Sequence, residues 1–150
     1  MIQRIQTLYL IIAIGLMVAF FFVPFGYGID TIKPSNEVLE QGLTGLNQGL
    51  SLIIPVSLSL LTMLIAIFSF KSLSGQKALI ALSALLIGAC IGVVIYYLTA
   101  GYSDTNPDVA IRTVWGGGGM LLIAAEIALF GAYRGVSHDQ KLLRSYDRIR

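Results

Sequence analysis

The sequence predicts an all-α membrane protein with four transmembrane helices, both termini in the cytoplasm and an amphipathic helix at the cytoplasmic C-terminus. Of its 150 residues, 56% are hydrophobic and only 12% are charged, and the mean hydropathy is +0.81. These values lie well outside the range of ordinary soluble domains. Four apolar runs, near residues 5–25, 50–70, 78–98 and 114–133, contain a single acidic or basic residue, Glu126. Each run has the roughly 20 residues that a helix needs to cross about 30 Å of hydrocarbon.

The first apolar run is expected to remain in the protein as a transmembrane helix. Met1–Arg4 supplies a short positive start, as in a secretory signal peptide. However, the apolar body Leu8–Val23 is longer than a typical signal core, and no small-x-small cleavage site follows Phe20–Phe25. None of the runs alternates with a period of two, which excludes the strands of a β-barrel.

The predicted orientation rests on the basic residues, because cytoplasmic loops of membrane proteins are enriched in lysine and arginine. Sorting the loops by side leaves only Lys33 and Arg112 outside, together with several acidic residues. We therefore predict a multi-pass protein of the bacterial inner membrane with both termini in the cytoplasm. The basic residues on the predicted cytoplasmic side are Arg4, Lys71, Lys77, Arg134, Lys141, Arg144, Arg148 and Arg150.

The connections between the runs differ in length and character. Residues 71–77 form a short basic segment, which predicts a tight antiparallel hairpin of the second and third helices. The outer segment 26–49 is longer, and Pro34–Glu40 has the features of a helix start, with a polar cap followed by acidic residues. Leucines then recur at helical spacing from Leu39 to Leu50. We expect a short helix on the outer membrane surface, which serves either as a solvated connection or as a binding element.

The fourth helix is expected to begin before the membrane. Asn106 can cap it, Pro107 suits its first position, and Asp108 favours its positive end. It would then pass through Trp115 into four consecutive glycines. Each glycine costs about 1 kcal/mol relative to alanine inside a helix. Either a neighbouring helix backbone approaches this tract closely, or the helix breaks there and exposes backbone groups to a ligand. The four glycines are Gly116, Gly117, Gly118 and Gly119.

Small residues at four-residue spacing predict further close helix contacts. Ala84, Gly88 and Gly92 share one face of the third helix. Lipid tails provide no hydrophobic drive for helices to associate, so close backbone contact and hydroxyl groups contribute instead. Such a face serves either internal packing or the helix of a partner protein.

Glu126 is the residue for which the sequence supports the most specific functional hypothesis. It lies about 12 Å before Arg134 along a helix, near the middle of the membrane. Placing a charge there costs at least about 2.5 kcal/mol. Thr62 lies at a similar depth and is the expected polar neighbour. The two interpretations are a polar contact, within the protein or to a partner, and proton or ion transport.

Other chemically active residues do not form recognisable sites. Cys90 and His138 are each the only residue of their type. The sequence contains no zinc-protease, dithiol, phosphate-loop or nucleophile-elbow motif. We therefore expect no enzymatic activity, catalytic residue, cofactor or metal site.

The tail 136–150 is predicted to form a unit distinct from the transmembrane domain 1–135. Ser137 and Gln140 fit a capping box, and apolar and basic residues then alternate in the pattern of an amphipathic helix. This helix would bind either anionic lipid headgroups or a cytoplasmic protein partner, whereas nucleic-acid binding is not indicated. The basic residues of the tail are Lys141, Arg144, Arg148 and Arg150.

Both ends of the chain resemble a known family. The opening Met1–Leu10 and the closing Asp139–Arg150 are similar to the ends of a small four-helix membrane family of Bacteroidota, known as domain of unknown function 4293. The resemblance implies a four-span inner-membrane protein and brings no activity or cofactor. Together with the lipid-facing helices and the basic tail, it leads us to expect an accessory or scaffold subunit that binds other integral membrane subunits. The alternative is a small proton- or ion-linked transporter that uses Glu126.

Overall fold

The structure is a computed structural model that describes residues 3–30, 43–46, 50–69, 72–100 and 111–147. Four of its helices are long and apolar enough to cross a membrane. The predicted class, a helical multi-pass membrane protein, is confirmed by these helices. In chain order the elements are α1 (Gln3–Phe22), β1 (Gly26–Asp30), α2 (Leu50–Phe68), α3 (Leu73–Ala100), β2 (Ile111–Trp115) and α4 (Gly118–Asp147).

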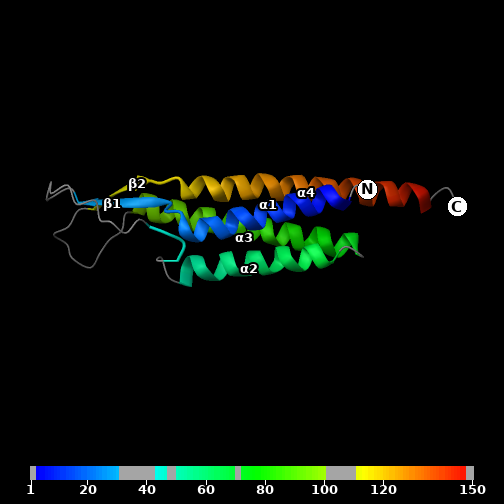
Figure 1. Ribbon diagram of the computed structural model, residues 1–150, viewed down its shortest axis with the longest axis horizontal. Coiled ribbons are helices and arrows are strands. Elements are labelled where there is room, and N and C mark those ends of the chain that lie inside the picture. Colours follow the sequence, from blue (N-terminus) through cyan, green and yellow to red (C-terminus); the bar gives the residue numbers. More distant parts are fainter. Residues whose placement is uncertain (1–2, 31–42, 47–49, 70–71, 101–110, 148–150) are drawn as a thin grey trace.

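The helices form one elongated bundle (Figure 1). α4 packs against α1 and α3, while α2 packs mainly against α3. The start of α1 and the end of α4 lie towards the same end of the bundle, as an even number of membrane crossings requires. α2 and α3 form the antiparallel hairpin predicted from their short connection. However, α3 begins at Leu73, inside the segment 71–77 that we expected to be a loop.

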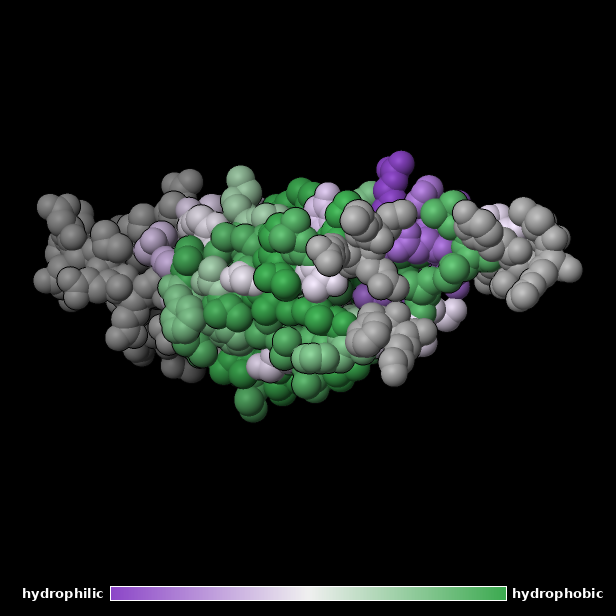
Figure 2. All heavy atoms as spheres, turned by 45° about the vertical axis from the view of Figure 1, so that its right-hand side comes forward, coloured by the Kyte–Doolittle hydropathy of each residue, from purple (hydrophilic) through white to green (hydrophobic). Residues whose placement is uncertain are grey.

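Each helix buries one narrow stripe and exposes its remaining apolar surface. Outward-facing Phe22 and Phe68 are 69% and 77% exposed. Figure 2 shows the result as an extensive hydrophobic surface over the middle of the bundle, with hydrophilic side chains gathered towards one end. Helices that are apolar on all sides fit hydrocarbon rather than water. On α2 the buried positions recur at helical spacing and are Leu52, Val56, Ser59, Thr62, Met63 and Ala66.

A short antiparallel ribbon extends the α1–α4 pair at the far end of the bundle (Figure 1). β1 pairs with β2 in a register that runs from Gly26↔Trp115 to Asp30↔Ile111. The prediction that the fourth helix passes through Trp115 is therefore wrong, because α4 begins only at Gly118. Residues 111–115 are rich in β-branched and aromatic side chains, which favour a strand when a partner strand lies alongside.

The predicted outer surface helix falls largely outside the described residues. Its expected start, Pro34–Glu40, is among these undescribed positions, as are Asn106, Pro107 and Asp108. Leu43, which we expected on that helix, instead forms a bridge with Gly26. The Leu43 N–H donates to the Gly26 carbonyl at 2.7 Å. The predicted helical spacing therefore does not continue through residue 43.

α4 is continuous from Gly118 to Asp147, so it includes most of the predicted tail. The predicted unit boundary between residues 135 and 136 lies inside this helix. Ser137 is an interior residue of α4, and the predicted capping box is wrong. Two side-chain hydrogen bonds join this part of α4 to other helices. Gln6 Nε2 on α1 donates to Asp139 Oδ2 at 2.5 Å, and Gln140 Nε2 donates to Ser74 Oγ on α3 at 3.0 Å.

Candidate functional site

Two glycines of the tract 116–119 sit against another backbone. A Cβ atom added to Gly116 would lie 2.5 Å from the Pro24 carbonyl oxygen, and one added to Gly118 would lie 2.5 Å from the Val23 carbonyl oxygen. The neighbour is thus the connection between α1 and β1, whereas we had expected a helix. The N–H groups of Gly116 and Gly118 donate to the carbonyls of Phe25 and Pro24 at 2.8 and 2.9 Å. Their backbone donors are therefore occupied within the protein.

The other two glycines of the tract, Gly117 and Gly119, are open. An added Cβ would meet no atom within 4 Å at either position. The tract contains the end of the ribbon connection and the first turn of α4. It works as a junction in which alternate glycines allow the chain to cross the α1–β1 connection.

A second glycine pair, which we did not predict from the sequence, brings α1 and α4 together. A Cβ added to Gly131 would lie 3.2 Å from the Tyr9 ring, and one added to Gly135 would lie 2.9 Å from Gln6 Cγ. The two glycines are four residues apart and therefore lie on one helix face. The four-residue spacing of these two glycines is visible in the sequence and could have predicted a close helix contact.

Gly88 and Gly92 do not pack against the other residues that the structure describes. Both are exposed on α3, and an added Cβ would meet no atom within 4 Å at either position. Ala84, one turn earlier on this face, is half-buried. The small-residue face of α3 therefore points largely away from the other described helices.

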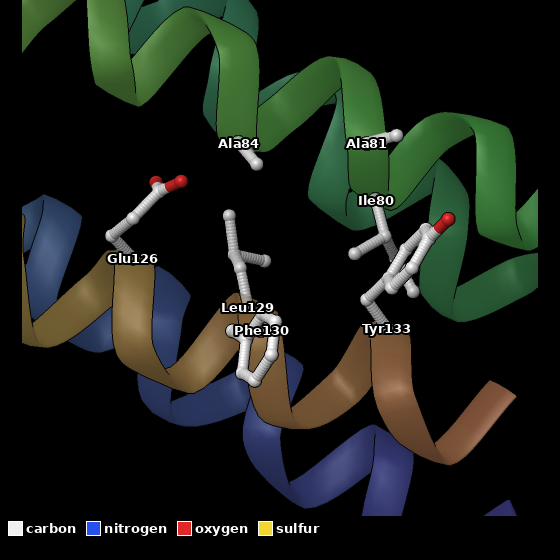
Figure 3. A pocket seen from close by; sticks show the side chains of 7 residues that line it. All are labelled: Ile80, Ala81, Ala84, Glu126, Leu129, Phe130 and Tyr133. Carbon is white, nitrogen blue, oxygen red and sulfur yellow. The ribbon is translucent and has the colours of Figure 1, made fainter. Parts of the chain in front are cut away.

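Glu126 lies beside this face, in an open pocket between α3 and α4. The pocket has a volume of about 270 Å³. Figure 3 shows the Glu126 side chain reaching from α4 towards Ala84 on α3. Its Oε2 atom is buried and has no hydrogen-bond partner among the described residues. Besides Glu126, the pocket is lined by Ile80, Ala81, Ala84, Leu129, Phe130 and Tyr133.

The pocket surrounds the carboxyl group with mostly apolar side chains. Ile80 and Leu129 are fully buried, whereas Phe130 is 66% exposed at the rim. The Tyr133 side chain also projects towards α3 (Figure 3), and the Lys77 ammonium lies 4.9 Å from the centre of its ring. The described polar groups near the pocket are thus the Tyr133 side chain and the Lys77 ammonium, besides Glu126 itself.

Thr62, the expected neighbour of Glu126, has a different partner. Its Oγ1 lies 2.7 Å from Ser83 Oγ on α3, and it also donates to the Ser59 carbonyl at 2.9 Å. All three side chains are buried. The structure thus places Thr62 in a polar contact between α2 and α3, and shows no hydrogen bond from it to Glu126.

Of the basic tail residues predicted as a binding site, Lys141 and Arg144 lie on the last part of α4. Lys141 is exposed. Arg144 belongs to the helical stretch, while Arg148 and Arg150 lie outside the described residues. His138 is exposed on α4, and Cys90 is buried in α3. In the part of the chain that the structure describes, no group of three His, Cys, Asp or Glu side chains is arranged to hold a metal ion.

The fold and this site define a polytopic helical membrane protein with one acidic side chain on an open helix face. The family model described as Domain of unknown function (DUF4293) matches residues 2–149. The chain therefore belongs to this family, as the resemblance of its two ends predicted. No curated protein and no solved structure is similar enough to count as a match.

Proposed function

We propose that this protein is a non-enzymatic accessory or scaffold subunit of a larger complex in a bacterial inner membrane. The resemblance of its ends points to a bacterium of the Bacteroidota, and the distribution of basic residues supports cytoplasmic termini. One observation carries the proposal. The α3–α4 face is open, and among the described residues the Glu126 Oε2 atom has no hydrogen-bond partner and Gly88 and Gly92 meet no neighbouring atom.

These features suit binding to another membrane helix. In lipid, helices associate through close backbone contact and interhelical hydrogen bonds, because the hydrophobic effect does not favour one apolar surface over another. Gly88 and Gly92 leave room for a neighbouring backbone, and Glu126 offers a polar contact at the same face. Within the bundle, the comparable contacts are already formed by Gly131 and Gly135 against α1.

The alternative, a small proton- or ion-linked transporter, is favoured by the carboxyl oxygen of Glu126 that lacks a partner. A transport path needs further polar groups at successive depths. The described pocket lining offers only the Tyr133 hydroxyl in addition to Glu126, and the other side chains are apolar. The pocket therefore supports a contact site better than a conduit.

The C-terminal basic residues supply a second proposed contact. Lys141 is exposed on the last part of α4, beyond the polar contacts of Asp139 and Gln140 to α1 and α3. We assign this segment to anionic lipid headgroups or to a cytoplasmic protein at the membrane surface.

The test is co-purification from native membranes in a mild detergent, comparing two kinds of glycine variant. Gly88→Leu and Gly92→Leu fill the open face of α3. Gly15→Leu is the matched control, since Gly15 is exposed on α1 and an added Cβ also meets no atom within 4 Å. We expect the wild type and Gly15→Leu to retain the same subunits at constant stoichiometry, and the two α3 variants to lose them.

Two results would overturn the accessory role. One is a wild-type protein that elutes without other subunits under these conditions. The other is equal retention of the subunits by all the glycine variants. Ion flux into liposomes that contain only this protein, abolished by Glu126→Gln, would establish the transporter instead.

A further inference from the structure

We infer that the α3–α4 face binds one transmembrane helix of another protein, and that this helix places an asparagine or glutamine side chain against Glu126. The inference rests on the proposed accessory function and names the chemistry of the partner. It starts from the depth of Glu126 and from the groups that surround its carboxyl group.

Glu126 lies midway between the start of α4 and Arg134, the first basic residue along this helix. Gly118, where α4 begins, and Arg134 are each about 12 Å away along the helix axis. The hydrocarbon layer is about 30 Å thick, so neither membrane surface is within reach of the side chain. A partner for Oε2 therefore has to come from a group inside the hydrocarbon.

Lipid cannot supply that group, because acyl chains at the membrane centre carry neither donors nor acceptors. A buried polar group without a hydrogen bond is costly even in soluble proteins. Glu126 avoids the full free-energy cost of an unpaired buried oxygen only when a polar side chain fills the pocket. The described pocket lining offers no such side chain within hydrogen-bond distance of Oε2.

The occupant must be helical in order to reach this depth. A chain inside hydrocarbon has to satisfy its own backbone, and a single segment does so only as a helix. The face next to Glu126 is shaped for such a segment. Ala81 and Ala84 line the pocket from α3, and α3 continues past Glu126 with the open positions Gly88 and Gly92.

Large apolar side chains are exposed on both helices close in sequence to the pocket residues. Leu85 on α3 is 69% exposed, and Ile127 and Phe130 on α4 are 68% and 66% exposed. Small residues between large ones form the groove into which the ridge of a second helix packs. The α3–α4 face therefore combines close approach, interdigitation and one polar contact.

The chemistry of the carboxyl group selects an amide as its partner. A carboxyl group at the membrane centre is least costly when it carries its proton. It then has one O–H donor and one carbonyl acceptor. The side-chain amide of asparagine or glutamine has both an acceptor and N–H donors. Two hydrogen bonds then form, from the carboxyl O–H to the amide carbonyl and from one amide N–H to the carboxyl C=O, without placing a charge in the hydrocarbon.

The experiment measures binding of a synthetic transmembrane helix to the full-length protein in lipid bicelles by resonance energy transfer. The probe is a leucine–alanine helix with one asparagine at its midpoint. One control peptide has leucine at that position. A second control carries the asparagine seven residues from the midpoint, about 10 Å away in depth.

We expect the wild type to bind the midpoint-asparagine peptide roughly five- to thirtyfold more tightly than either control peptide, the range of one interhelical hydrogen-bonding contact in model peptides. Glu126→Leu should abolish this preference. Glu126→Gln should retain it, because glutamine also donates and accepts. Thr62→Val is the matched control, since it removes a buried polar group on the α2–α3 side and should leave the preference unchanged.

Three outcomes would overturn the inference. They are equal binding of all peptides by the wild type, a preference that survives in Glu126→Leu, and self-association of the protein that excludes the peptide from this face. Each is distinguishable from failure of the accessory role. Subunits that still co-purify through Gly88 and Gly92, without any preference for the amide peptide, would leave that role in place.

Discussion

Single glycine-to-alanine exchanges in the tract 116–119 should alternate in their effect on stability. A Cβ at Gly118 would lie 2.5 Å from the Val23 carbonyl oxygen and 2.9 Å from the Phe25 nitrogen. These are backbone atoms, so relief requires movement of the whole α1–β1 connection. At Gly119, the next residue, an added Cβ meets no atom within 4 Å.

The structure sets the sign and the approximate size of the two effects. Gly119→Ala replaces glycine in the first turn of a helix and should stabilise the protein by up to about 1 kcal/mol. Gly118→Ala has the same gain in propensity but adds a methyl group to an occupied space, which typically costs about 1–3 kcal/mol. The difference between the two variants isolates this contact, and we expect it to be about 1–3 kcal/mol.

The assay is equilibrium unfolding in mixed micelles with increasing amounts of a denaturing detergent, followed by the helical circular dichroism signal. Gly116→Ala should behave like Gly118→Ala, and Gly117→Ala should cost less than either. Equal stability of Gly118→Ala and Gly119→Ala, or a Gly118→Ala variant that is more stable than the wild type, would refute the close approach of the two backbones.

Two further contacts predict separable effects on the same unfolding assay. Thr62→Val and Ser83→Ala should show a coupling energy of about 0.6 kcal/mol in a double-mutant cycle, the average for hydrogen bonds between membrane helices; additive effects would contradict a direct contact. Gln6→Leu should cost about 1–3 kcal/mol, because Gln6 is only 2% exposed and its loss leaves Asp139 without this donor. Gln140→Leu removes an exposed bond to Ser74 and should cost less; a larger loss for Gln140→Leu than for Gln6→Leu would contradict this order.

The four helices could be predicted because hydrocarbon imposes a strict length on an apolar segment. Leu50–Phe68 agrees with its prediction to within two residues. The ribbon could not be predicted in the same way. A strand needs a partner, and Gly26–Asp30 and Ile111–Trp115 are far apart in the sequence. Only the pairing of α1 with α4 brings them together.

The candidate site was predictable in its residues and not in its arrangement. Glu126 was recognisable as an acid in an apolar run, and its depth followed from the distance to Arg134. Its surroundings were not recognisable. Thr62 lies at a matching depth, but α2 packs mainly on α3, so the hydroxyl contacts Ser83 instead.

The sequence by itself determined the four apolar helices, their approximate limits and the family, because these depend on segment length, composition and the characteristic ends of the chain. Only the tertiary structure decided which helix faces are used inside the bundle. Gly88 and Gly92 have the same spacing as Gly131 and Gly135, yet the first pair is open and the second packs against α1. Helices that are apolar on all sides have no polar face to orient them. Their contacts, and the open face beside Glu126, are therefore determined by how the four helices pack together.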